Sequence, residues 1–377
     1  MRSAFIHTDV HKDYDYGAWH PLKLVRYSLT YELIRAYGLL DLPWVSVVEP
    51  EPAREEEILT FHTPGYVEAL RTANSGLPFA GAGWYGLGVG GDNPIFKGVY
   101  DLSLLSAGGS IRAARMVDDG EVDVAFFIGG GLHHALEDRA SGFCYFNDPV
   151  LAIYELLRRG RRVVYIDIDA HHGDGVQQAF YHTDRVLTIS IHETGRTLFP
   201  GTGFETETGA GQGEGYAVNM PLLPGTDDEV FVHAFEEVVP PLIEAFKPDR
   251  FVTQLGIDTL RLDPLTHLDL TTNGFIRLVE RIRDMAIGKW VAVGGGGYNL
   301  SNVVRGWTLA WAVMNGVDLP DDLPESLRGV IEKHSIEETA LRDRPYISRD
   351  QEKAMKDAER VIGYLKEMVF PLMNQTV

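Results

Sequence analysis

Acidic residues and a histidine alternate in the segment Tyr165–Gly175, YIDIDAHHGDG, which follows an apolar run. If the segment is extended, Asp167, Asp169 and His171 point to the same side of the chain. Carboxylates are costly to bury at such a position unless they bind a metal or a hydrogen-bond partner. We interpret Asp169 and His171 as ligands of one divalent ion, with Asp258, which follows another apolar run, as the best candidate for the third. Such a set leaves one coordination position for water, as in catalytic zinc sites. Taken singly, Asp169 could cap a helix and His171 could be an ordinary core histidine.

The adjacent histidines His133 and His134 suit the proton transfers that a metal-activated water needs. Imidazole acts as a general base and a general acid near neutral pH. Each ring needs a carboxylate to orient it, and Asp167 and Asp174 remain for this task, one for each histidine. The spacing leaves a second interpretation open, in which both histidines bind a second metal.

Four consecutive glycines precede Tyr298 in the segment Gly294–Tyr298. Glycine contributes no packing to a strand, so this run indicates a backbone that lies close to a bound ligand. The hydroxyl of Tyr298 could then approach the metal and stabilise an oxyanion formed from a polarised carbonyl. The alternative is a glycine-rich surface turn with an ordinary tyrosine.

Each of these motifs follows an apolar run typical of a buried strand, and helical segments lie between the runs. Strands are expected at Ala4–His7, Val122–Ile128, Arg162–Ile168, Val186–His192, Arg250–Gly256 and Lys289–Val293. Helices are expected at Asp148–Arg158, Asp228–Phe246 and Thr272–Ala286. This alternation predicts a parallel sheet with helices on both faces, whose strand ends bring the motifs to one edge.

No linker or repeat divides the chain, so we expect a single domain over residues 1–377. Within it, residues 321–377 are expected to form a helical extension that packs on the body, with an amphipathic helix at Asp350–Met368.

The 377 residues carry a formal net charge of −20 and one cysteine, Cys144. The charge argues against nucleic-acid binding. The single cysteine excludes a disulfide framework and a cysteine-rich zinc module, and it fits a reducing cytoplasm. The first residues, MRSAFIHTDVHKD, do not resemble a signal peptide, and no apolar run approaches the ~20 residues of a membrane span. We therefore expect a cytoplasmic protein with no nucleic-acid or membrane partner.

Five motifs, in the order GGLHHA, SGFCYFND, YIDIDAHHGDG, LGID and GGGGY, make the chain resemble the zinc-dependent histone deacetylase superfamily. The segment His192–Gly203, HETGRTLFPGTG, is most similar to the bacterial acetoin-utilization deacetylases. The resemblance extends from about His20 to Trp311. It implies a single-domain arginase-deacetylase α/β fold, with a central parallel sheet of about eight strands flanked by helices. It also implies one catalytic Zn²⁺, or Fe²⁺ in the cell, beneath a narrow tunnel.

The resemblance makes Asp169, His171 and Asp258 the zinc ligands. It assigns the general base and acid to His134, oriented by Asp174. It makes His133, paired with Asp167, an electrostatic partner, and Tyr298 the residue that polarises the substrate carbonyl. Further residues match positions near the substrate: Phe143 and Phe199 as aromatic walls, Gly142 between them, Leu265 at the rim, Asp92 on the substrate backbone and Arg26 in an inner cavity for leaving acetate.

Structural potassium ions are also implied by the resemblance. One site would use Asp167, Asp169, His171, Ser190 and Ile191. A second would use carbonyl groups of Phe180, Thr183, Val186 and Tyr216.

The implied reaction is hydrolysis of Nε-acetyl-lysine, or of lysine with another small acyl group, in proteins. The main alternative is an acetylpolyamine amidohydrolase, but Leu265 stands where some of those enzymes have an acidic gatekeeper. An arginase-like enzyme with two manganese ions needs carboxylates at the positions of Gly173 and Leu260. A non-catalytic acyl-lysine binding module would have lost a ligand or the tyrosine, and neither is lost here.

In a bacterium, the acyl-lysine substrate could be a metabolic enzyme such as an acyl-CoA synthetase. The sequence defines neither the acyl preference nor the oligomeric state, and it assigns no role to Arg196.

Overall fold

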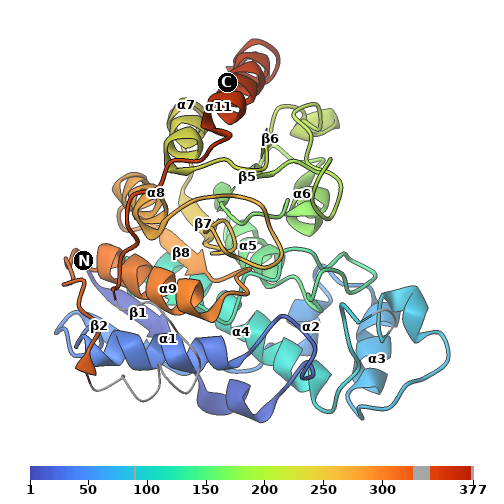
Figure 1. The fold of residues 1–377 in the computed structure, drawn as a ribbon. Helices are drawn as coiled ribbons and strands as arrows, with labels where there is room; N and C mark the ends of the chain where they lie inside the picture. The colour runs from blue at the N-terminus through green and yellow to red at the C-terminus, as the bar shows by residue number, and fades with distance from the viewer. Residues whose placement is uncertain (89–90, 326–339, 375–377) are drawn as a thin grey trace.

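The computed structural model describes residues 1–88, 91–325 and 340–374, which are built around one sheet of eight parallel strands (Figure 1). The strands are β1 (Ser3–Ile6), β2 (Val45–Val48), β3 (Val124–Phe127), β4 (Val163–Asp167), β5 (Val186–Glu193), β6 (Ala217–Leu222), β7 (Arg250–Gln254) and β8 (Trp290–Val293). Their order across the sheet is β2-β1-β3-β8-β7-β4-β5-β6, and all neighbouring strands are parallel. The parallel sheet expected from the sequence is confirmed.

The six strands expected from the sequence are present, with ends shifted by one or two residues. The other two strands lack a continuous apolar run. β2 has the sequence VSVV at one edge of the sheet, and none of its residues is fully buried. β6 is buried but contains Asn219 and Pro221, and the proline is tolerated because β6 forms the opposite edge. Continuous apolar runs therefore identify the central strands but not these two edge strands.

Helices cover both faces of the sheet, as the alternation of strands and helical segments predicts. The helices are α1 (Val25–Ala36), α2 (Glu55–Ile58), α3 (Pro64–Ala73), α4 (Val99–Asp118), α5 (Asp148–Arg158), α6 (Asp174–Phe180), α7 (Asp228–Phe246), α8 (Thr272–Met285), α9 (Leu300–Met314), α11 (Gln351–Tyr364) and α12 (Phe370–Asn374). Helices α4 and α5 contact the central strands and each other, whereas α7, α8, α9 and α1 pack in succession on the other side (Figure 1).

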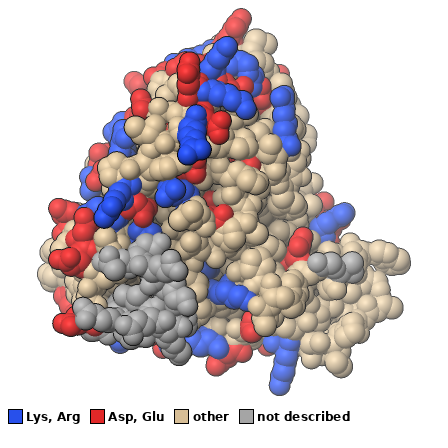
Figure 2. Space-filling view, in the orientation of Figure 1, with Lys and Arg blue, Asp and Glu red and all other residues tan. Residues whose placement is uncertain are grey.

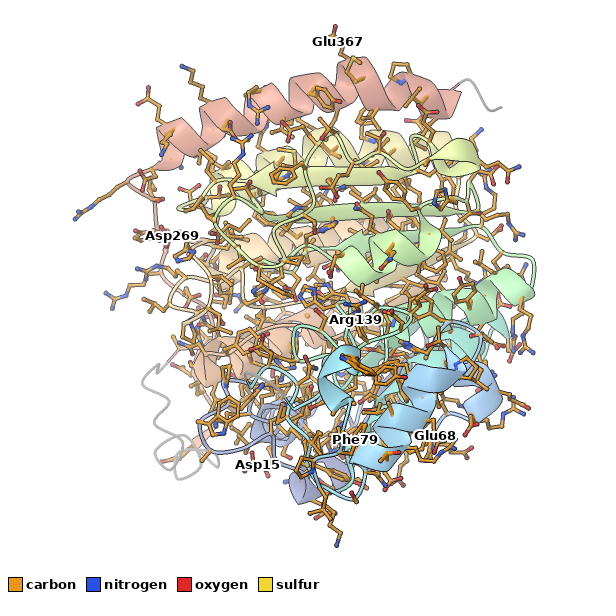
Figure 3. The ribbon with its side chains drawn as sticks, turned by 90° about the vertical axis from the view of Figure 1, so that its right-hand side faces the viewer. Asp15, Glu68, Phe79, Arg139, Asp269 and Glu367 are labelled. Atoms are coloured by element: carbon orange, nitrogen blue, oxygen red, sulfur yellow. The ribbon has the colours of Figure 1, made fainter. Side chains whose placement is uncertain are left out.

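Near the C-terminus, α11 packs against α7 and β6. It continues through a wider turn at Leu365–Val369 into α12. Figure 3 shows this helix along the top of the molecule, with Glu367 directed outward. Parts of the expected C-terminal extension, residues 326–339 and 375–377, lie outside the described residues.

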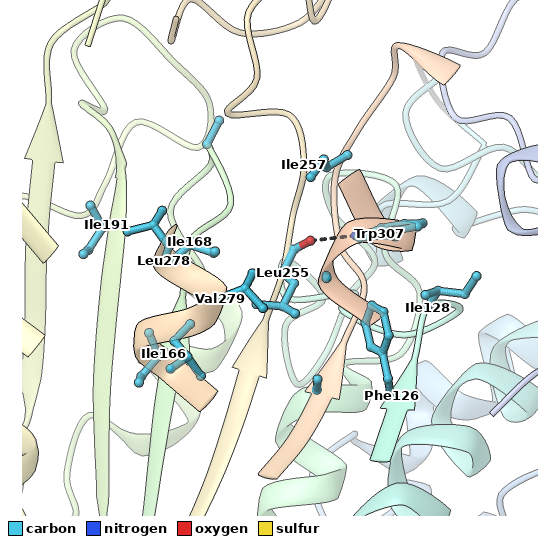
Figure 4. Close-up of a cluster of buried hydrophobic side chains, with 14 of the residues drawn as sticks. Phe126, Ile128, Ile166, Ile168, Ile191, Leu255, Ile257, Leu278, Val279 and Trp307 are labelled. Atoms are coloured by element: carbon cyan, nitrogen blue, oxygen red, sulfur yellow. Dashed lines mark hydrogen bonds between the residues drawn. The ribbon is translucent and has the colours of Figure 1, made fainter. Parts of the chain in front are cut away.

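Apolar side chains fill the space between the sheet and the helices. In one such cluster, the central strands contribute Phe126 and Ile166 and α8 contributes Leu278 (Figure 4). The indole Nε1 of Trp307, on α9, donates a hydrogen bond of 2.8 Å to the carbonyl of Leu255. Because Leu255 directly follows β7, this bond anchors the turn that leads to Asp258.

Charged side chains of both signs lie next to one another on the surface shown in Figure 2. In the described part of the chain, no helix combines the length and the apolar character that crossing a membrane requires.

Candidate active site

The motifs singled out in the sequence follow four strands that are neighbours in the sheet. β3 leads to the histidine pair, β8 to the glycine run, β7 to Asp258, and β4 to Asp169 and His171. Parallel strands end at the same edge, so the side chains that follow them meet there. The structure brings together all the residues that the sequence suggested for the chemistry.

Asp169, His171 and Asp258 form one buried group. The Nδ1 atom of His171 lies 3.1 Å from Asp169 Oδ1 and 2.9 Å from Asp258 Oδ2. The expectation that Asp167, Asp169 and His171 alternate along one extended segment is wrong, since β4 ends at Asp167. The following backbone instead bends, because Asp167 accepts a hydrogen bond from the Asp169 N–H and Asp169 accepts one from the His171 N–H.

This group fits a divalent metal ion. Among the described residues, it is the only set of three or more His, Cys, Asp or Glu whose ligand atoms all lie within 4.8 Å of one another. Two buried carboxylates with one imidazole carry net negative charge, which a divalent cation would neutralise. A side chain at Gly296 would place its Cβ 2.0 Å from Asp258 Oδ2, so glycine is required beside the ligands. Oxygen and imidazole ligands without cysteine suit Zn²⁺ and also Fe²⁺.

The histidine pair lies beside this group, and each ring contacts its own carboxylate. His133 Nδ1 lies 2.7 Å from Asp167 Oδ2, and His134 Nδ1 lies 2.7 Å from Asp174 Oδ1. The two Nε2 atoms lie 3.0 Å apart. These contacts leave no ring nitrogen of the pair directed at further acidic residues, so the geometry favours proton transfer over a second metal site.

The two histidines differ strongly in their affinity for protons. Burial lowers the pKa of His133, but the charges of Asp167 and Asp169 outweigh it and bring that pKa to about 9. Burial and the neighbouring charge of His133 lower the pKa of His134 to about 4, against the opposing effect of Asp174. At neutral pH the pair therefore contains a protonated His133 and a neutral His134, which can accept a proton.

Tyr298 follows the glycine run and lines the same cavity as His134 and His171. Burial, and then the charges of Asp258 and Asp169, raise its pKa well above the usual value, so its hydroxyl remains a hydrogen-bond donor. The glycine run is tightly packed: a Cβ on Gly295, whose φ is 149°, would lie 2.2 Å from Gln254 Nε2. The glycines thus let this loop lie directly on the end of β7.

A cavity of about 230 Å³ leads from the surface to these residues. Phe143 and Phe199 line two of its walls: the Phe143 ring lies 5.6 Å from the ring of Tyr298, and the Phe199 ring lies 5.0 Å from that of His134. A Cβ on Gly142 would lie 2.5 Å from the His134 ring. A larger residue at position 142 would therefore displace the histidine.

Two of the remaining residues expected near the substrate line this cavity, and the third borders a smaller space. Leu265 is partly buried and lines the cavity, and Asp92 is exposed and lines it too. Arg26 is buried and borders a smaller space of about 20 Å³, enough for about one water. Its Nη1 donates to the carbonyl of Gly297 at 2.9 Å, and its Nη2 donates to the hydroxyl of Tyr27 at 2.9 Å.

The two potassium sites stay predictions. Ser190 lies opposite Asp167 in the register of β4 and β5, and its hydroxyl lies 2.8 Å from His192 Nδ1. The four residues of the second site lie around the ends of α6, β5 and β6. The guanidinium of Arg196 lies 6.0 Å from the ring of Phe204, which points to no catalytic role.

Several polar residues in contact with the site were missed in the sequence, and three of them are Gln254, Asn147 and Asp148. Gln254, buried at the end of β7, donates from Nε2 to Asp169 Oδ2 at 2.6 Å. Asn147 donates to the carbonyl groups of His133 and Ala135, and Asp148 accepts the N–H groups of the preceding loop, Gly131 and Leu132. The sequence features that could have pointed to them are a glutamine inside an apolar run and an Asn-Asp pair at the start of an apolar helix.

Comparison with known proteins agrees with this geometry. A family model described as the histone deacetylase domain matches residues 20–314. The chain is 41% identical over 329 residues to the acetoin utilization protein AcuC of Bacillus subtilis, covering 85% of this chain and 84% of that protein. It is 43% identical over 313 residues to histone deacetylase RPD3 of Saccharomyces cerevisiae, covering 83% and 71% of the two chains.

Among solved structures, the crystal structure of an HDAC homolog from Aquifex aeolicus is similar, with a TM-score of 0.86 and 34% identity. The match covers 95% of this chain and 100% of that chain. The eight-stranded sheet with its flanking helices is thus the arginase-deacetylase fold.

Proposed function

The chain belongs to the histone deacetylase family and is a deacetylase, and we propose that it hydrolyses Nε-acetyl-lysine in proteins with one catalytic zinc ion. The observation that carries this proposal is the buried group of Asp169, His171 and Asp258 directly beside the histidine pair. The same donor set also accommodates ferrous iron, which we propose as an alternative metal in the cell.

Asp169, His171 and Asp258 would hold the metal. When bound, it would polarise the amide carbonyl and acidify a water molecule near neutral pH. Tyr298 would donate its hydroxyl hydrogen to the carbonyl oxygen as negative charge develops there. Its raised pKa supports this role, because the phenol keeps its proton.

His134 would take the proton of the attacking water and later deliver it to the nitrogen of the leaving lysine amine. Asp174 orients its ring through Nδ1, so its Nε2, which faces Nε2 of His133 at 3.0 Å, would exchange that contact for the attacking water. The protonated His133, held by Asp167, keeps the pKa of His134 low and favours the base form before attack. The products are acetate and a free lysine side chain.

The shape of the cavity supports a long, thin substrate group. Phe143 and Phe199 would offer aromatic surfaces to the methylene groups of an acyl-lysine side chain, and Asp92, which lines the same cavity, would bind the substrate backbone. The rim residue Leu265 is apolar, which favours a protein substrate over an acetylated polyamine. We propose an acylated protein, such as a metabolic enzyme, as the partner, with potassium ions in structural roles and the cytoplasm as location.

The test is a panel of acyl-lysine peptides measured beside acetylated polyamines, with and without a chelator and with zinc added back. We expect peptide hydrolysis that the chelator abolishes and zinc restores. Faster hydrolysis of the polyamines would reassign the substrate. Binding of acyl-lysine peptides without release of acetate would indicate a binding module instead.

A further inference from the structure

Asp263 is a buried acidic residue that connects the loop of Tyr298 to the rim of the cavity. Its side chain is 7% exposed and lies 35 positions before Tyr298 in the chain. Oδ2 accepts the backbone N–H of Tyr298 at 2.7 Å, and Oδ1 accepts the backbone N–H of Leu265 at 3.0 Å. One carboxylate thus joins the tyrosine proposed for catalysis to the residue proposed for substrate selection.

The backbone loop before Tyr298 has few side chains of its own that could hold it in place. Its four preceding residues are glycines, which have no side chains to pack and lose much conformational freedom when they are ordered. Gly295 and Gly297 have φ values of 149° and 135°, which few other residues adopt. A hydrogen bond to an ionised carboxylate is about twice as strong as one between neutral groups. The bond from the Tyr298 N–H to Asp263 is therefore well suited to fix this loop.

The turn that carries Asp263 is itself held in an uncommon conformation. Leu262 has a φ of 70°, in the left-handed region, although its side chain is 67% exposed and gains little from burial. The carbonyl of Leu262 accepts a hydrogen bond of 3.3 Å from the side chain of Asn299, next to Tyr298. Such backbone strain persists only where the surroundings enforce it. Here the turn directs Asp263 inward, against the Tyr298 loop.

We propose that Asp263 is a positioning residue that holds Tyr298, and with it Leu265, in the geometry needed for hydrolysis. This inference rests on the proposed function, because it assigns the hydroxyl of Tyr298 a role in the reaction. Asp263 touches neither the substrate nor the metal ligands through its hydrogen bonds. Its hydrogen bonds act on the rate through Tyr298, and its charge, in addition to burial and Asp169, helps to raise the pKa of the ligand Asp258.

A double-mutant cycle tests this dependence. Asp263→Asn keeps the shape of the side chain but replaces one of its two acceptor oxygens by an NH₂ group, which cannot accept a backbone N–H. With the acetyl-lysine peptide, we expect kcat to fall by about 10–100-fold with KM within about twofold, because small displacements of reacting groups are costly. In the Tyr298→Phe background, the same change should cost less than about threefold. Equal losses in both backgrounds, or no loss in the wild-type background, would overturn the proposal.

A second measurement does not depend on activity. Amide hydrogen exchange of residues 294–299, followed by mass spectrometry without substrate, should become at least about tenfold faster in Asp263→Asn. The matched control is Asp228→Asn, because Asp228 also accepts a backbone N–H, that of Thr271 at 2.7 Å, but lies at the start of α7. The control should leave the exchange of residues 294–299 and kcat unchanged, even where it lowers the melting temperature.

If Asp263→Asn does not fold, Asp263→Ser, which keeps one hydroxyl acceptor, is measured in the same way. Unchanged exchange of residues 294–299 in a folded variant would refute the anchoring by Asp263. If the wild-type protein hydrolysed no acyl-lysine peptide, the proposed function would fail, whereas the exchange data would still decide whether Asp263 fixes the loop.

Discussion

The Nε2 atoms of His133 and His134 face each other at 3.0 Å, so one ring donates a hydrogen bond to the other. The pKa of His133 is raised to about 9 and that of His134 is lowered to about 4, so the shared proton belongs to His133 at neutral pH. Each ring also contacts its own aspartate through Nδ1. The two adjacent histidines therefore differ in protonation state because their surroundings differ.

The pH dependence of kcat/KM should reflect this difference. Activity is expected to decline below the pKa of His134, as the base becomes protonated, and above the pKa of His133, as its positive charge is lost. Asp167→Asn removes the strongest influence that raises the pKa of His133, so the decline at high pH should begin at a lower pH. Asp269→Asn, at the edge of the molecule (Figure 3), is the control and should keep the wild-type profile. An unshifted decline in Asp167→Asn would contradict the assignment of His133.

Removal of one hydroxyl should reveal the role of Tyr298. Tyr298→Phe is expected to reduce kcat by two orders of magnitude or more, about 3 kcal/mol for one oxyanion donor. The measurement is the steady-state rate on an acetyl-lysine peptide, with circular dichroism to verify the fold. A rate close to that of the wild type would remove Tyr298 from the mechanism.

Loss of one ligand should release the metal. Asp258→Ala is expected to abolish stoichiometric zinc retention, because two ligands remain of three. Metal content per chain is measured after dialysis by atomic spectrometry. Asp174→Asn is the matched control, since it should retain zinc but lose activity through His134. Equal zinc content in Asp258→Ala and the wild type would show that the ligand set is misassigned.

The residue at position 265, on the rim of the cavity, should determine the preference between peptide and polyamine substrates. Leu265→Glu places a carboxylate at the mouth and is expected to raise the ratio of acetylpolyamine to acetyl-lysine peptide kcat/KM by about tenfold, the effect of about 1.4 kcal/mol. Leu262→Glu adds the same charge three positions away, on a residue that does not line the cavity. It should leave the ratio near that of the wild type. If both variants shift the ratio equally, general charge rather than position 265 determines the preference.

The sequence predicts the central strands and the residues at their ends well, because both leave local signals. Apolar runs identify β4 and β7, and the functional side chains follow them directly. The edge strand β2 gives no such signal, since exposure on one side removes the need for apolar residues.

The supporting polar residues are harder to predict, because their partners lie far away in the chain. Asp263 acts on a backbone N–H 35 positions later, and Gln254 acts on Asp169, 85 positions earlier. Neither contact has a spacing rule that the sequence alone could reveal. Only the fold determines which of many polar residues reaches the site.

The ligands and the histidine pair follow the four adjacent central strands, whereas Phe199 and Leu265 lie farther along the connecting segments. Directed evolution of acyl-chain preference can therefore concentrate on libraries at these two positions. The chemistry itself tolerates little change, because the glycines packed on the ligands admit no larger side chain. The residues proposed for the chemistry and those proposed for substrate selection thus lie on different parts of the fold, so they can be varied separately.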